Sequence, residues 1–442
     1  MPARKSHTRA LSEEARLAKN KRIKEAGIAT RARRAAMDCR VFDLKIVESK
    51  LNRKQKEALY SVFREYKWLR NSALAAQRFD TDYLKELNGE VQVKTPNGFA
   101  TRKIKWLGSQ MQQGVIATLK ANLKTLSALK KKGYRVGKLK FVSDWNSIDL
   151  QQFGVTYKLL ADPKGRYTKI RVQNIPGKLR VRGFEQLNRP GIEFANAKLV
   201  KRVDGFHLLV TTYLPKSVQT PSKKLGVDFG ITTQFTLSDG SGVTVLADEP
   251  EKLKRLQRKL SRQERNSNSY NRTLKKLKRK HQRLDNRKDE QANQLVRRWT
   301  DHTAVYFQDE NLNSWKRRDS GSRGSKKVHH GIMGRVKTRL QRNPYAVMLP
   351  KWVATTAWCP SCGIRTKQEL SARTYSCGCG YRAPRDIHAA RNMILLGDRY
   401  QQFTSGTEGS AGGEKVRLPA VLYAPLERFS VKPETATALV SP

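Results

Sequence analysis

The segment Cys359 to Asn392 reads CPSCGIRTKQELSARTYSCGCGYRAPRDIHAARN and holds four of the five cysteines of the chain. These cysteines form two close pairs, Cys359/Cys362 and Cys377/Cys379, on either side of a loop of 14 residues. Four thiolates in two short pairs can close a tetrahedral zinc site, with each pair forming a knuckle whose backbone amides turn toward sulfur. We therefore predict a structural zinc finger in this segment.

Two disulfides, or a reactive thiol pair, would be the alternative use of the same cysteines. Disulfides are typical of oxidising compartments, and nothing else in the sequence points to one. The fifth cysteine, Cys39, stands alone and is expected to be a small core residue. Cysteine usage therefore favours zinc binding in a reducing cytoplasm.

The 442-residue chain is strongly basic, with 89 Lys and Arg against 38 Asp and Glu and a formal net charge of +51. A chain of this length can form two or three domains. The positive surplus predicts nucleic acid as the partner, with an anionic membrane surface as the weaker alternative. No apolar run approaches the roughly 20 residues that span a bilayer, and the N-terminus is too basic for a signal peptide. We expect no membrane partner.

The first third of the chain reads as mainly helical. Residues 1–37 predict a fraying helix or a disordered arm, and 39–48 predict a strand. Amphipathic helices are expected from about residue 52 and over 107–132, with a turn-rich gap at 88–98 between them. The first of these helices carries three aromatic residues among its cations, and we expect at least two to pack in the core rather than stack on bases: Phe63, Tyr66 and Trp68.

The pattern changes twice further along. Residues 138–215 alternate polar and apolar side chains over several short runs, which predicts a small antiparallel barrel or sandwich. Residues 224–240 begin another domain with two strands, and the second strand ends at a hairpin turn. Residues 250–299 then read as a very basic helical hairpin broken at 266–269, whose outer cations either face phosphates or are merely solvated. Beyond 403 we expect disorder.

Three acids stand in unusual settings. Asp228 interrupts an apolar strand, Glu310 ends another, and Asp386 opens a helix. An ionised carboxylate in an apolar sheet is costly unless a cation compensates it, and carboxylate oxygens are ligands for Mg²⁺ or Mn²⁺. Such a trio suits a two-metal phosphodiesterase with a ribonuclease-H-like core. Each acid alone could equally be a turn or cap residue.

The ordered motifs resemble a known family. They are Gly226-Val-Asp228-Phe-Gly, the basic hairpin, Glu310-Asn-Leu-Asn, the two cysteine knuckles, and Arg-Asp386-x-x-Ala-Ala-x-Asn. This order resembles the RuvC-type nuclease of transposon-encoded TnpB proteins and, equally, of the miniature type V CRISPR effectors that descend from them. The resemblance covers residues 40 to 396, and the whole set is specific although no single motif is.

The resemblance implies an RNA-guided DNA endonuclease that binds a guide RNA, recognises a short motif flanking its DNA target, and works as a monomer or homodimer on RNA. Asp228, Glu310 and Asp386 would be the catalytic and Mg²⁺-binding triad. Cys359, Cys362, Cys377 and Cys379 would hold structural Zn²⁺. The protein would act in a prokaryotic cytoplasm, associated with the nucleoid. The implied fold class is multidomain α+β, with a ribonuclease-H-like (RuvC) α/β domain that contains the finger, an antiparallel β-barrel (wedge) domain and a helical recognition domain.

The resemblance also implies a domain layout in which two domains are split in sequence. These domains are a basic extension at 1–38, the wedge at 39–50 and 137–220, the recognition domain at 51–136, the RuvC domain at 221–355 and 382–402, the finger at 356–381, and a disordered tail at 403–442. Two positions depart from the family pattern. Pro384 stands where Asp is frequent, and His388 where Asn is frequent. His388 would contact a phosphate or the metal shell, or simply pack; we favour a neutral ring near the metal shell.

Other classes of function remain open at this point. The chain could bind DNA under RNA guidance and act by occupancy without cutting, but that interpretation predicts a lost triad acid. It could be a zinc-ribbon RNA-binding protein without chemistry, which leaves the acids unexplained. A DDE-type transposase would use three acids on the same fold, yet it gives no reason for the hairpin or the finger. Transposon and CRISPR association are not separated by the chain itself.

Overall fold

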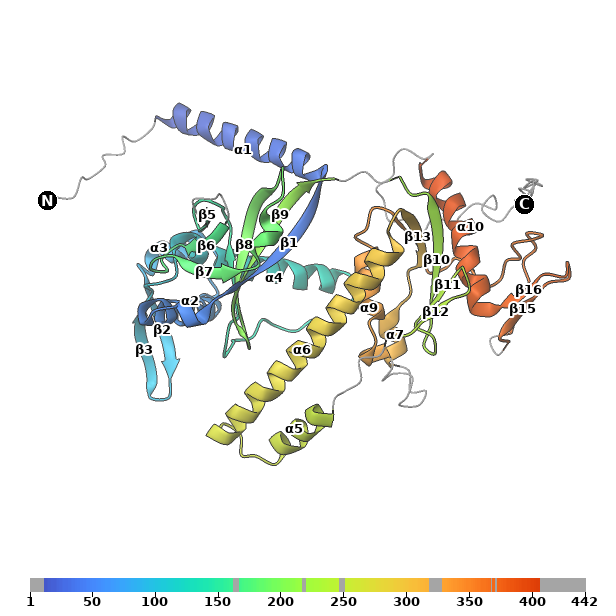
Figure 1. The fold of residues 1–442 in the computed structure, drawn as a ribbon. Helices are drawn as coiled ribbons and strands as arrows, with labels where there is room; N and C mark the ends of the chain where they lie inside the picture. The colour runs from blue at the N-terminus through green and yellow to red at the C-terminus, as the bar shows by residue number, and fades with distance from the viewer. Residues whose placement is uncertain are drawn as a thin grey trace, which may run out of the picture. The chain divides into compact units, whose positions relative to one another are not determined.

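The computed structural model describes residues 12–161, 167–216, 220–245, 251–317, 328–366, 368–369 and 372–405. The chain divides into two compact units, Met1–Ser217 and Val218–Pro442, which are described separately (Figure 1). None of the helices in the described part of the chain has the length and apolar character that crossing a membrane requires.

The first unit is built on a seven-stranded antiparallel sheet in the order β4-β8-β9-β1-β7-β6-β5. The sheet curls until it nearly closes, because Tyr157 on β5 donates its hydroxyl to the carbonyl of Ala195 on β8 at 2.7 Å. This barrel-like sheet agrees with the prediction for 138–215. Its strands are β1 (Met37–Ile46), β4 (Ser147–Leu150), β5 (Tyr157–Ala161), β6 (Tyr167–Val172), β7 (Leu179–Arg182), β8 (Glu193–Arg202) and β9 (Gly205–Pro215).

The helices of this unit are α1 (Glu13–Ala35), α2 (Arg53–Ala75), α3 (Thr81–Glu86) and α4 (Ser109–Lys131). A capping box between Asn52 and Gln55 fixes the start of α2. Phe63 and Tyr66 are buried in the core, while Trp68 is half-buried beneath the guanidinium of Arg64. Two of the three aromatic residues therefore pack as expected.

Two expectations for the first unit were wrong. Residues 88–98 do not form a mere gap, because β2 (Glu90–Thr95) pairs with β3 (Gly98–Lys103) in a hairpin, with Val91 buried. Cys39 is exposed rather than in the core. Alternate residues of β1 point to opposite faces, and Phe42 and Leu44 take the inward face, which leaves Cys39 outside.

The second unit contains a five-stranded mixed sheet in the order β12-β11-β10-β13-β14. β13 is parallel to both of its neighbours, β10 and β14, whereas β11 is antiparallel to both of its neighbours, β10 and β12. A separate two-stranded sheet pairs β15 with β16. The strands are β10 (Lys223–Phe229), β11 (Phe235–Leu237), β12 (Gly242–Val243), β13 (Thr303–Gln308), β14 (Ala346–Leu349), β15 (Thr374–Ser376) and β16 (Arg382–Pro384).

Helices cover both faces of the mixed sheet (Figure 1). On one face, α6 (Asn268–Trp299) and α9 (Met333–Leu340) pack against Val227 and Phe307. On the other face, α10 (Arg385–Ser405) packs against Tyr306 and Val347. A Cβ on Gly226 of β10 would collide with the backbone carbonyl of Ala390. The missing side chain therefore lets α10 lie directly on β10.

The basic hairpin consists of α5 (Glu251–Ser261) and α6, and the expected break lies between them. Asn266 turns the chain with a φ of 68°, and the Ser267 hydroxyl caps α6 by accepting from the amide of Tyr270 at 3.1 Å. The short α7 (Leu312–Arg317) follows β13. Because α10 continues to Ser405, residues 403–405 are helical and not part of the disordered tail that we expected at 403–442. The remainder of that segment, 406–442, lies outside the described residues.

Candidate functional site

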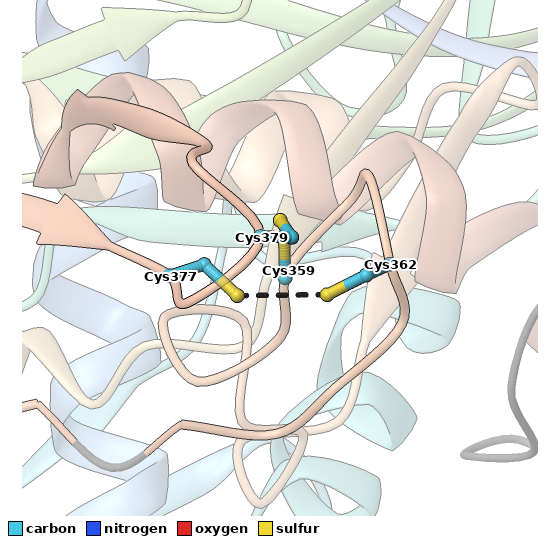
Figure 2. A group of neighbouring side chains, drawn as sticks. All are labelled: Cys359, Cys362, Cys377 and Cys379. Atoms are coloured by element: carbon cyan, nitrogen blue, oxygen red, sulfur yellow. Dashed lines mark hydrogen bonds between the residues drawn. The ribbon is translucent and has the colours of Figure 1, made fainter.

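The four cysteines of the finger converge on one point (Figure 2). The Sγ atoms of Cys359 and Cys379 are 3.6 Å apart, and those of Cys362 and Cys377 are 3.5 Å apart. A disulfide needs about 2.05 Å, whereas tetrahedral zinc at about 2.3 Å from each sulfur sets them about 3.8 Å apart. The donor set therefore fits a zinc ion, and all four cysteines are free thiols.

The thiols differ in acidity. The backbone amide of Cys379 donates to Cys377 and lowers the pKa of that thiol to about 7, while burial raises the pKa of Cys359 to about 12. Metal ligands must be deprotonated, so zinc binding releases protons.

The three acids come from neighbouring elements. Asp228 lies on β10, and Glu310 follows the end of the parallel neighbour β13 by two residues. Neighbouring parallel strands bring their carboxyl ends to the same edge of a sheet. Asp386 lies in the first turn of α10, which packs on β10. The fold thereby gathers residues that are far apart in sequence.

Electrostatics place these acids within one site. Burial, then the negative charges of Asp386 and Glu310, raise the pKa of Asp228 to about 8. Burial also raises the pKa of Glu310. Among the described residues, the four cysteines are the one group of three or more potential metal ligands whose ligand atoms all lie within 4.8 Å of one another, so the acids form a looser group. Three hard oxygen donors, with the charges of Asp386 and Glu310 acting on buried Asp228, fit divalent cations such as Mg²⁺.

We expect the metal-free protein to lose stability as pH rises from about 4 to 8. Folded Asp228 keeps its proton up to about pH 8, whereas the unfolded chain releases it near the ordinary aspartate pKa of 3.8, so the folded state binds more protons in between. Asp228→Asn should remove this contribution and raise the free energy of unfolding at pH 8 by roughly 1 to 3 kcal/mol. Urea denaturation from pH 5 to 9 in Mg²⁺-free buffer measures it; parallel pH profiles for the two proteins would contradict the prediction.

His388 packs instead of facing a ligand. Its ring is fully buried and stacks on Tyr375 of β15 with centroids 3.7 Å apart and planes 11° apart. Burial lowers the pKa of His388 to about 4, so the ring is neutral. The neutral ring was expected, but with no exposed surface it does not contact a phosphate.

Sequence reasoning missed three polar residues around the acids. Lys337 of α9 pairs with Asp309 at 2.5 Å and donates to the backbone carbonyl of Glu310 at 2.6 Å, which fixes the backbone at that acid. Gln308 and Asn392 bind the chain that leads into the finger. Gln308 gave the one local signal in the sequence, because it is a polar residue at the end of an apolar strand. Lys337 and Asn392 gave none, because their partners are distant in sequence.

Two family models match parts of the chain. Residues 207–304 match the OrfB family of IS605, described as a probable transposase. Residues 339–393, which include all four cysteines and Asp386, match the Cas12f1-like TNB domain. The two segments lie on either side of Glu310.

Curated proteins are similar over part of their length. A protein of Streptomyces pristinaespiralis named "Putative RNA-guided DNA endonuclease" is 26% identical over 226 residues, which are 48% of this chain and 53% of that protein. "Putative transposase A625R" of Paramecium bursaria Chlorella virus 1 is 26% identical over 230 residues, 49% of this chain and 53% of that protein. The chain thus spans about half the length of the curated relatives it matches.

A chain from the cryo-EM structure of the Cas12f1-sgRNA-target DNA complex aligns with 81% of this chain and 99% of its own length, at 11% identity. Its TM-score of 0.39 is too low to establish a shared fold. The two family models lie in the same order as the motifs that they cover, and the curated relatives are named as an RNA-guided DNA endonuclease and a transposase. By these similarities, the chain resembles TnpB proteins.

Proposed function

We propose that this protein is an RNA-guided DNA endonuclease that binds a guide RNA, recognises a short motif beside its target and cleaves DNA with Asp228, Glu310 and Asp386. The observation that carries the proposal is the electrostatic coupling of these acids at one edge of the mixed sheet. The zinc-type cysteine cluster directly precedes the helix that bears Asp386. The curated relative from Streptomyces supports the same class of activity.

The strand order supports a ribonuclease-H-like domain of the RuvC type. Numbered within this unit, the strands lie in the order 3-2-1-4-5, with strands 1, 4 and 5 parallel. We assign residues 221–355 and 382–402 to this domain and 356–381 to the finger. The barrel-like sheet would be the wedge, and the helices of 51–136 the recognition domain. Guide pairing would then carry most of the sequence specificity.

The three carboxylates would hold Mg²⁺ or Mn²⁺. When bound, two such ions supply Lewis-acid stabilisation of the attacking and leaving oxygens of a phosphodiester. The chain itself does the positioning. Asp228 is set by β10, Asp386 by α10 on the Gly226 surface, and the backbone of Glu310 by Lys337. Neutralising the mutual repulsion of the acids would let Asp228 ionise at neutral pH.

The hairpin carries the charge pattern of a phosphate-binding surface. On α6, Asp285 and Asp289 pair with Arg335 and Arg339 of α9. The preceding half of α6, 268–283, contains seven Lys and Arg and no acid. These two arginines of α9 are thus paired with acids of α6, while the first half of α6 has no acid of its own beside its cations and would present them to nucleic acid.

Neutralising part of this surface should weaken RNA binding and its salt dependence. We expect the triple change Lys276→Gln, Arg279→Gln and Arg283→Gln to reduce the slope of log K against log salt by about 2 to 3, since each phosphate contact contributes about 0.7 to 0.9. Filter binding between 50 and 300 mM NaCl measures the slope. A matched control replaces Lys85, Lys103 and Lys198, which pair with acids; equal slope changes in both triples would contradict the assignment.

The proposed activity can be tested through the RNA itself. The protein is purified from cells that carry its native locus, and the copurified RNA is sequenced. One dominant RNA with a variable end would support guidance, and that end names the DNA to assay for Mg²⁺-dependent cleavage. An origin in a repeat array would indicate a CRISPR effector, and a transposon flank a mobile element. Heterogeneous RNA, or none, would overturn the guided part of the proposal.

A further inference from the structure

The loop of residues 350–358, which leads from β14 into the finger, is held from one side by a buried amide. Gln308, the last residue of β13, places its Nε2 within hydrogen-bond distance of three loop carbonyls: those of Pro350 at 3.1 Å, Lys351 at 3.2 Å and Val353 at 2.6 Å. Its Oε1 accepts from the hydroxyl of Thr355 at 3.4 Å. Gln308 is 5% exposed and stands two residues before Glu310.

A second buried amide holds the same loop from the other side. Asn392 of α10 donates from Nδ2 to the carbonyls of Thr355 at 2.8 Å and Trp358 at 2.7 Å. The second of these carbonyls belongs to the residue directly before Cys359. Asn392 is 1% exposed and follows Asp386 by six residues on the same helix. Asn392 therefore lies on the helix that carries Asp386, and Gln308 ends the strand that leads to Glu310.

The finger is also fastened to α10 beyond the loop. Tyr375 lies between Cys362 and Cys377 in sequence and stacks on His388, and the Nε2 of His388 lies 3.1 Å from the amide nitrogen of Asn392. Both ends of the finger thus meet the turn of α10 that follows Asp386. Burying these polar groups unpaired would cost about 1 to 3 kcal/mol each, so a displaced finger would leave the amides unsatisfied.

We infer that Gln308 and Asn392 are positioning residues that couple the cysteine cluster to the acid site. They act by clamping loop 350–358 between β13 and α10, so that a zinc-loaded finger holds Glu310 and Asp386 at their working separation. The inference rests on the proposed function, because it takes the acids as metal ligands. It adds that the acid site is complete only when the finger is folded.

Mn²⁺ binding to the intact protein without nucleic acid tests this coupling without relying on cleavage. Mn²⁺ prefers carboxylate to thiolate, and its free concentration is read by electron paramagnetic resonance. We expect Asn392→Asp and Gln308→Glu, which keep the shape of each side chain and remove its donors, to weaken Mn²⁺ binding about tenfold. Gln341→Glu makes the same change at an exposed position and should leave the affinity as it was.

A second measurement uses the unmodified protein, so the test does not depend on how the variants fold. Zinc is withdrawn stepwise with a thiol-site chelator, the chelator is removed, and Mn²⁺ affinity is followed against remaining zinc. We expect the Mn²⁺ affinity to fall in step with the zinc content. Unchanged Mn²⁺ affinity after complete zinc loss, or in both amide variants, would overturn the coupling and leave the proposed function standing. If the unmodified protein shows no Mn²⁺ binding that Asp228→Ala removes, the acid site fails and the coupling fails with it.

Discussion

Asp228→Ala abolishes Mg²⁺-dependent DNA cleavage, with an expected loss of about a thousandfold or more, while guide-RNA affinity stays within about twofold. The size of the loss follows from the setting of Asp228, whose pKa is raised to about 8 by burial and then by the charges of Asp386 and Glu310. Removing it takes away one hard ligand of a shared metal site, and the stabilisation of charge at both reacting oxygens depends on that site. Single-turnover cleavage with saturating protein measures the chemical step, and filter binding measures RNA affinity.

Asp239→Ala is the matched control for this prediction. Asp239 lies in the turn between β11 and β12, is exposed, and accepts from the backbone amide of Ser241 at 2.8 Å. Its loss should leave cleavage nearly unchanged. Equal loss of RNA binding and cleavage in Asp228→Ala would mean that the acid supports the fold. Undiminished target occupancy with no cleavage even in the unmodified protein would favour an RNA-guided binder that does not cut.

Cys362→Ser removes zinc from the finger and lowers soluble yield severalfold. Structural zinc contributes binding free energy on the order of 10 kcal/mol to small zinc domains, and a hydroxyl is a poor substitute for one of four thiolates whose sulfurs lie within 4.8 Å of one another. We expect zinc content to fall from about one per chain to well below one. Metal analysis by mass spectrometry, together with limited proteolysis around 359–379, measures the change.

Cys39→Ser supplies the control for the finger. It makes the same chemical change at the exposed cysteine of β1, in the other unit of the chain. Zinc content and yield should be unaffected. An unchanged zinc count in Cys362→Ser would exclude the four-cysteine site, whereas equal zinc loss in both variants would indicate a general effect of altered thiols on the preparation.

Local rules predicted the parts of the fold that local chemistry decides. The start of α2 at Asn52, the break at Asn266 and the position of Asp386 in the first turn of a helix were all readable from capping and turn residues. The β2–β3 hairpin was not predicted, because the turn residues of 88–98 indicated a gap, although Val91 and Val93 alternate on its first strand. The same alternation of inward and outward side chains along β1 would have predicted that Cys39 faces outward.

The candidate site was predictable as a set of residues but not as a structure. The acids stood out because an acid in an apolar strand requires a compensating charge. The amides of Gln308 and Asn392 did not, because their partners are carbonyls 34 to 45 residues away. The burial of His388 against Tyr375 depends on how the finger folds back onto α10. This tertiary contact cannot be predicted from a short stretch of sequence.

The order of the elements along the chain also has a consequence for synthesis on the ribosome. Asp228 is translated 158 residues before Asp386 (386 minus 228), and α10 is the last helix of the described chain. At about 5 to 20 residues per second, roughly 8 to 30 s separate the first acid from the last. The first unit is complete before β10 emerges. A nascent chain therefore has its barrel-like unit well before the acid site can assemble, because that assembly must wait until α10 has been synthesised.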